Sequence, residues 1–212
     1  MKKRNKWYKY YKYYALILLT ILIIGVVFYK DIINLTINLT GFTVFQNKFS
    51  KNLGELNSIN SKYNTNLYTF PLTIEKGELL LEDLNGMKDG LSEVPEPFKL
   101  LLDIRIKLVE SDIYFKEGWK YGKGSTTKYG FGCKKGLQRL RNATFNRNMS
   151  SQIGYDAVSL MKEIIEEYPK EAEIANITSK HVLFLNATFY QEQKDAVRDR
   201  RLIERACVKD EE

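Results

Sequence analysis

The sequence predicts a mainly α-helical protein, in which a single transmembrane helix near the N-terminus precedes a helical bundle with a glycine-rich basic loop. Three observations support this fold class. A charge-free apolar run lies near the N-terminus, apolar residues recur every three or four positions along much of the remaining chain, and the 212 residues contain only four prolines and no regular hairpin signals. The alternative is an α+β fold with a short strand at 33–40, where apolar and polar residues alternate.

Residues 13–32 are predicted to form an uncleaved transmembrane signal anchor. No charged residue occurs from Tyr13 to Tyr29, and the most apolar part, Ala15 to Phe28, reaches roughly 25 Å as a helix, the short end of a membrane span. A cleaved signal peptide is the rival hypothesis, but large residues follow the run where small ones would form a cleavage site. The sequence therefore predicts the lipid bilayer as a partner of 13–32.

The basic residues around this run predict its orientation. Residues 1–12 form a tail with six basic side chains and several aromatic rings, whereas Lys30 is followed at once by Asp31. The positive-inside rule places residues 1–12 in the cytoplasm and residues 33–212, as one domain, outside it. The predicted location is the cell membrane, with a single span.

The distribution of charge argues against a nucleic-acid partner. The chain has 33 Lys plus Arg and 26 Asp plus Glu, for a formal net charge of +7. Seven of the basic residues lie in the first thirty positions, which contain no acid, so residues 31–212 are balanced. The excess is an orientation signal beside a membrane segment, and no nucleic acid is expected to bind.

Periodic apolar residues predict the first helices of the exterior domain. Residues 42–62 carry them at helical spacing, 63–71 are rich in Asn and Thr and predict a loop, and 74–91 predict a helix that two glycines weaken. Pro95 and Pro97 then interrupt the chain. The domain therefore opens with two helices joined by a polar loop.

The clearest helical pattern begins after these prolines. Residues 98–119 place four apolar side chains on one face, namely Leu101, Ile104, Leu108 and Phe115. Ser151 is predicted to cap a further helix that ends before Pro169, and 170–208 to form a last helix whose second half is charged. Together these segments predict a helical bundle.

Residues 118–150 are predicted to form a basic, glycine-rich loop. Between Glu117 and Asp156 there are eight basic residues and no acid, and six of the thirteen glycines lie in 118–136. Exposed backbone N–H groups, cations and aromatic faces suit an acidic glycan, a phosphate or a lipid headgroup, so an anion-binding module using 118–155 is an alternative function. The other interpretation is that the loop neutralises acidic helices of its own domain. The residues assigned to the anion are Lys120, Lys123, Lys128, Lys134, Lys135, Arg139, Arg141, Trp119 and Tyr129.

Two further features fit an exterior domain. Asn-x-Ser/Thr triplets, the acceptors of N-glycosylation, occur six times beyond the anchor, and the two nearest the bilayer are set aside. The predicted glycosylation sites are Asn142, Asn148, Asn176 and Asn186. The two cysteines, Cys133 and Cys207, are predicted to form a disulfide, with two buried thiols as the alternative.

The sequence contains no familiar catalytic or metal-binding motif. The single histidine, His181, lies in a segment predicted to be helical and half buried, and adjacent carboxylates such as Glu166 and Glu167 point to different parts of a helix surface. No catalytic residue, metal or cofactor is assigned. The predicted function is a non-enzymatic structural or recognition role at the cell surface, with a surface protein or a polyanion as the candidate partner. A membrane-bound hydrolase that uses carboxylates is a further alternative.

Overall fold

The computed structural model describes residues 43–91, 94–122 and 133–209. The chain divides into two compact units, Met1–Asn47 and Lys48–Glu212. In the first unit, residues 43–47 are helical. The predicted anchor at 13–32 and the alternative strand at 33–40 lie outside the described residues. Within the described ranges, no helix combines the length and the apolar character needed to cross a bilayer.

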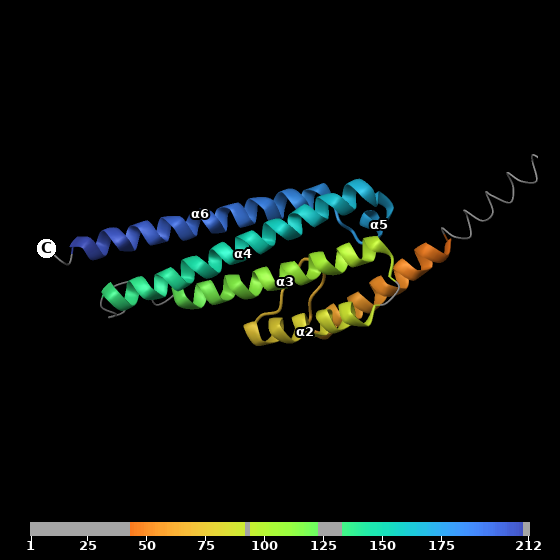
Figure 1. The fold of residues 1–212 in the computed structure, drawn as a ribbon, viewed down its shortest axis with the longest axis horizontal. Coiled ribbons are helices and arrows are strands. Elements are labelled where there is room, and N and C mark those ends of the chain that lie inside the picture. The colour runs from red at the N-terminus through yellow and green to blue at the C-terminus, as the bar shows by residue number, and fades with distance from the viewer. Residues whose placement is uncertain (1–42, 92–93, 123–132, 210–212) are drawn as a thin grey trace, which may run out of the picture. The chain divides into compact units, whose positions relative to one another are not determined.

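The second unit is built from helices, and the described residues contain no strand (Figure 1). This confirms the mainly α prediction for the described part of the chain. Helical residues 48–62 come first. The elements that follow are α2 (Ile74–Gly90), α3 (Glu96–Gly122), α4 (Cys133–Glu167), α5 (Pro169–Ile174) and α6 (Ser179–Lys209).

Three long helices position the side chains that are considered below. α4 packs along α3 on one side and along α6 on the other, while α2 packs against α3 (Figure 1). Two contacts fix each direction. Lys107 and Ser111 of α3 contact Asp156 and Ser150 of α4, respectively. Ser150 and Ser151 of α4 donate hydrogen bonds to Glu192 and to the Phe189 carbonyl of α6, respectively. Each neighbouring pair of these helices therefore runs antiparallel.

The core lies mainly along α3. Three members of its predicted apolar stripe, Leu101, Ile104 and Leu108, are fully buried, as expected. The fourth, Phe115, is only half-buried because the core cluster does not extend to the last turns of α3. The hydrophobic burial that stabilises the unit is therefore concentrated at one end of α3.

The prediction of a long loop at 118–150 is wrong for the residues that the structure describes. α3 continues to Gly122, and α4 begins at Cys133, so only 123–132 lie outside the described residues. Ser151, predicted as an N-cap, instead lies within α4 and is fully buried. The first half of α4 packs through small side chains rather than a large apolar stripe, and this leaves no hydrophobic period to detect. The buried residues described in this half are Gly136, Leu140, Ala143, Thr144, Asn146 and Ser150, of which only Leu140 is large and apolar.

The single helix predicted at 170–208 is also wrong, because the structure divides it. α5 ends at Ile174, and Asn176 adopts a left-handed backbone conformation with φ of 56°, which asparagine tolerates better than most residues. The Ile177 N–H then donates to the Ala172 carbonyl at 2.7 Å, and α6 begins at Ser179. This turn sends α6 back along α4.

A buried arginine organises the loop between residue 62 and α2. Arg105 of α3 has no exposed surface. Its Nε donates to Asn60 Oδ1 at 2.8 Å, its Nη1 to the Leu67 carbonyl at 3.0 Å, and its Nη2 to Thr65 Oγ1 at 3.2 Å and to the Thr69 carbonyl at 3.0 Å. Burial lowers the pKa of Arg105 to about 10, so the side chain stays charged at neutral pH. The loop carbonyls and the asparagine solvate this charge, which makes Arg105 a structural residue.

Candidate functional site

The candidate site is a groove between α3 and α6, and α4 contributes Arg147 to its lining. It encloses about 510 Å³. Aromatic side chains line it from both sides, with Phe115 and Trp119 on α3 and Phe184 on α6. Arg147 and Glu192 supply charged groups within the same groove. Hereafter we call it the aromatic groove.

Two glycines of α3 explain how Arg147 reaches this position. Gly118 and Gly122 are four residues apart and share one face of α3. A Cβ atom added at Gly118 would lie 3.0 Å from Arg147 Cγ and 3.1 Å from the Ala143 carbonyl oxygen. The same atom at Gly122 would lie 3.6 Å from Arg147 Nη2. The missing side chains therefore let α4 approach α3 closely and let Arg147 lie flat across it.

A chain of polar side chains joins the three helices beside the groove. Ser111 Oγ donates to the Ser150 carbonyl at 2.8 Å, and Ser150 Oγ donates to Glu192 Oε2 at 3.3 Å. Burial raises the pKa of Glu192 to about 7, although the Ser150 hydrogen bond and the charge of Arg147 favour its ionised form. Glu192 is therefore partly protonated at neutral pH, which is a common property of groups at functional sites.

The rims of the aromatic groove expose apolar rings to solvent. Trp119 is 49% exposed and Phe184 is 69% exposed. Single exposed apolar residues are ordinary, but rings on both walls of one groove beside ionisable groups are typical of a binding surface. Of the residues assigned from sequence to an anion, Trp119 lies in this groove. No motif in the sequence pointed to Phe184, Arg147 or Glu192.

Three more of the side chains that were assigned to the anion are described, and all three lie on helices. Lys120 is exposed on the last turn of α3, and Arg139 and Arg141 lie on α4. Lys123, Lys128 and Tyr129 lie outside the described residues, and so do the side chains of Lys134 and Lys135. Gly118, Gly122 and Gly136 are helical, so their N–H groups belong to helices and do not form the anion-binding loop expected for them.

The fold adds basic residues from α6 to this end of the unit. The contacts of Ser150 with Glu192 and of Ser151 with Phe189 set the antiparallel register between α4 and α6. That register places Arg141 about level with Arg201. The acid-free first half of α4 therefore lies beside the arginine-rich second half of α6, and segments far apart in sequence form one basic end (Figure 1).

The predicted glycosylation sites and the two cysteines lie at different kinds of position. Asn176 is exposed in the turn before α6, while Asn148 and Asn186 are exposed on helices and Asn142 is half-buried on α4. Asn176 is thus the described sequon with the surface-turn geometry expected of a glycan acceptor. The use of all four sites stays a prediction. The predicted disulfide joins side chains that lie outside the described ones, although Cys133 begins α4 and Cys207 belongs to α6.

His181 has a local structural role. Its ring stacks on Tyr68 with a centroid separation of 4.1 Å and an interplanar angle of 18°. Its Nδ1 lies 3.0 Å from Thr178 Oγ1, and the Tyr68 hydroxyl donates to the Asn176 carbonyl at 2.9 Å. These contacts hold the turn before α6 against the loop that Arg105 organises. Among the described residues, no group of His, Cys, Asp or Glu has the arrangement of a metal site.

Comparisons with known proteins do not assign the chain to a family. No family model, curated protein sequence or solved structure matches it.

Proposed function

We propose that this chain is a single-pass membrane-anchored surface protein with a non-enzymatic recognition role, and that its helical unit meets a partner through the aromatic groove. The observation that carries the proposal is the exposure of Trp119 and Phe184 on opposite walls of a groove that also holds Arg147 and Glu192. Aromatic rings with about half or more of their surface exposed gain free energy when a partner covers them.

The membrane anchor is supported by the sequence. Residues 13–29 lack charge, and the basic groups cluster on their N-terminal side. The test is protease treatment of intact cells that express the full chain with a tag at each end. External protease should remove the C-terminal tag and spare the N-terminal tag. Loss of the N-terminal tag alone, or protection of both tags until the cells are lysed, would contradict the proposed topology.

The groove is tested by placing a photo-crosslinking phenylalanine analogue at residue 119 in intact cells. Ser159, which is exposed on α4 and is not part of the groove lining, provides the matched control position. A discrete adduct from residue 119 that is absent from residue 159, and that is lost with Phe184→Ala, is expected. The same adducts from both positions would show that the groove is not the contact surface.

Anion binding is the second candidate function. The observation that favours it is the convergence of Arg139 and Arg141 of α4 with the arginines of α6 at one end of the unit. The full chain in non-ionic detergent should be retained on immobilised heparin and released as salt rises, because exposed charges are screened. Retention that does not depend on salt would contradict this function.

A further inference from the structure

α6 carries a row of cations to which the sequence analysis gave no role. Lys194, Arg198, Arg201 and Arg205 follow one another at intervals of four, three and four residues. At about 100° per residue, the four positions lie within about 60° of one another on the helix surface. At about 1.5 Å per residue they extend over roughly 16 Å. All four are exposed, so α6 carries a narrow band of basic residues along its length, which we call the α6 row.

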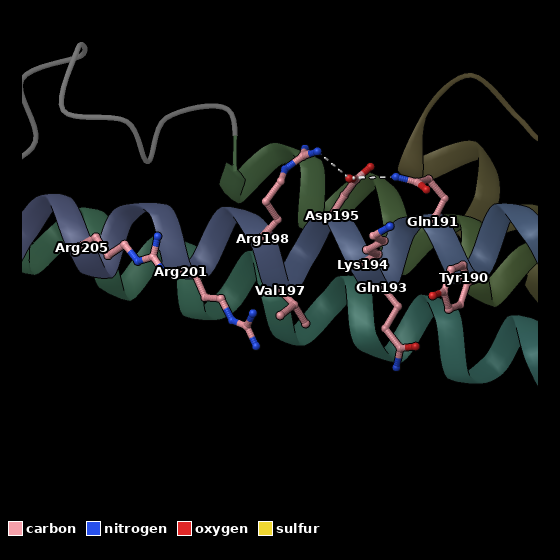
Figure 2. Close-up of a pocket in the computed structure, with 9 residues that line it drawn as sticks. All are labelled: Tyr190, Gln191, Gln193, Lys194, Asp195, Val197, Arg198, Arg201 and Arg205. Atoms are coloured by element: carbon pink, nitrogen blue, oxygen red, sulfur yellow. Dashed lines mark hydrogen bonds and ion pairs between the residues drawn. The ribbon is translucent and has the colours of Figure 1, made fainter.

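An open hollow of about 630 Å³ follows this row (Figure 2). The described residues that line it all belong to α6, and they form an open trough along the helix surface. Tyr190 and Val197 lie among the cations, and Tyr190 is 59% exposed. A trough of this kind accommodates an extended ligand along the helix better than a compact one.

The charges of the α6 row are only partly neutralised within the described part of the chain. Arg198 Nη1 lies 3.1 Å from Asp195 Oδ1, which also accepts a hydrogen bond from Gln191 Nε2 at 3.0 Å (Figure 2). The ion pairs between described side chains do not include Arg201 or Arg205. Neighbouring cations repel one another, so a ligand with negative charges along its length relieves that repulsion.

We propose that the α6 row binds a linear acidic glycan, a polymer that carries carboxylate or sulfate groups at regular intervals. Its anionic groups pair with successive arginines, whose planar guanidinium groups match carboxylate and sulfate geometry. The exposed ring of Tyr190 offers an apolar face to a sugar. This inference rests on the exterior location in the proposed function and extends the second candidate function to a surface outside 118–155.

Charge and shape disfavour the other occupants of the trough. A second copy of α6 packed antiparallel would bring the row against residues 179–191, which contain no carboxylate. A bilayer presents a plane of headgroups, whereas the row is a narrow band and has the carboxylate of Asp195 on its flank. A single polymer chain fits the narrow row and can pair with Arg201 and Arg205, which lie beyond the Asp195–Arg198 ion pair.

The experiment measures heparin affinity of the full chain in non-ionic detergent, with Arg201→Gln/Arg205→Gln as the test variant. The control is Lys162→Gln/Lys180→Gln, which removes the same charge from exposed positions elsewhere on α4 and α6. Loss of two charge-assisted contacts should weaken binding roughly tenfold, and the control should change it less than about twofold. Circular dichroism verifies that both variants fold.

The possible outcomes separate this inference from the functions proposed above. Equal weakening by the test and control variants would overturn it, since only net charge would then matter. If Arg139→Gln/Arg141→Gln abolishes heparin binding while the test variant binds normally, anion binding stands and the α6 row does not carry it. Absence of heparin binding by the unmodified chain would overturn both this inference and the anion-binding function. Binding to phosphatidylserine vesicles that weakens in the test variant, without any change toward heparin, would replace the glycan with a membrane surface.

Discussion

Charged side chains have different surroundings near the two ends of α3. In the N-terminal half of α3, Arg105 is fully enclosed, and its guanidinium group donates to three backbone or amide oxygens and to a hydroxyl. Near the other end, the aromatic groove leaves Arg147 and Glu192 half-buried beside exposed rings. A charge that the chain itself solvates stabilises the fold, whereas the half-buried charges of the groove lie beside exposed apolar rings that a partner can cover.

The largest expected effect on stability comes from replacing the enclosed Arg105. Arg105→Met keeps much of the side-chain volume but leaves Asn60 Oδ1 and the Leu67 and Thr69 carbonyls without their donor. Each orphaned buried acceptor is costly, so the free energy of unfolding should fall by about 3 kcal/mol or more. Urea denaturation of the full chain in detergent, followed by circular dichroism, measures this. Arg141→Met, at an exposed position, is the control and should change stability by less than about 0.5 kcal/mol.

The next largest effect on stability is expected where α4 and α6 pack closely next to the groove. A Cβ atom at Gly154 would lie 2.4 Å from the Phe189 ring, so Gly154→Ala should destabilise the chain by about 1–3 kcal/mol through overpacking. Gly86→Ala is the matched control, since no atom lies within 4 Å of its added Cβ in α2. The control should raise stability by about 0.5–1 kcal/mol, because alanine favours helix. Destabilisation by both variants would contradict the packing argument.

Glu192, in the aromatic groove, should make the stability of the chain depend on pH. Its pKa rises from 4.5 to about 7 on folding, so the folded state holds the proton more tightly than the unfolded state does. The resulting stabilisation is fully present below about pH 4.5 and is lost as pH rises through about 7. Glu192→Gln should therefore remove this decline, and unfolding measured across that window detects it. Glu166→Gln, at an exposed carboxyl, should leave the pH profile unchanged.

The smallest stability effect is expected at the rim of the groove. Phe184 is 69% exposed, so Phe184→Ala removes little buried area and should cost less than about 1 kcal/mol. The same variant should abolish the crosslink from residue 119. A large loss of stability would show that this ring belongs to the fold rather than to a binding surface.

Sequence periodicity was a good guide where burial is apolar and a poor one where it is polar or close-packed. The helix predicted at 74–91 matches α2, and the stripe of Leu101, Ile104 and Leu108 is buried as expected. The start of α4 was missed because small residues form its contact face. The aromatic groove was largely missed because its residues come from three helices. Of these residues, only Trp119 was assigned to a binding site from the sequence.

By itself, the sequence determined the helical class, the apolar face of α3 and the uneven distribution of charge, because these depend on local spacing and composition. The position of Glu192 beside Ser150, the path of Arg147 across Gly118 and the alignment of α6 with the basic half of α4 depend on how the helices pack. The burial of a side chain, its pKa and the charged groups near it depend on neighbours that are distant in sequence. Only the tertiary structure could therefore decide them.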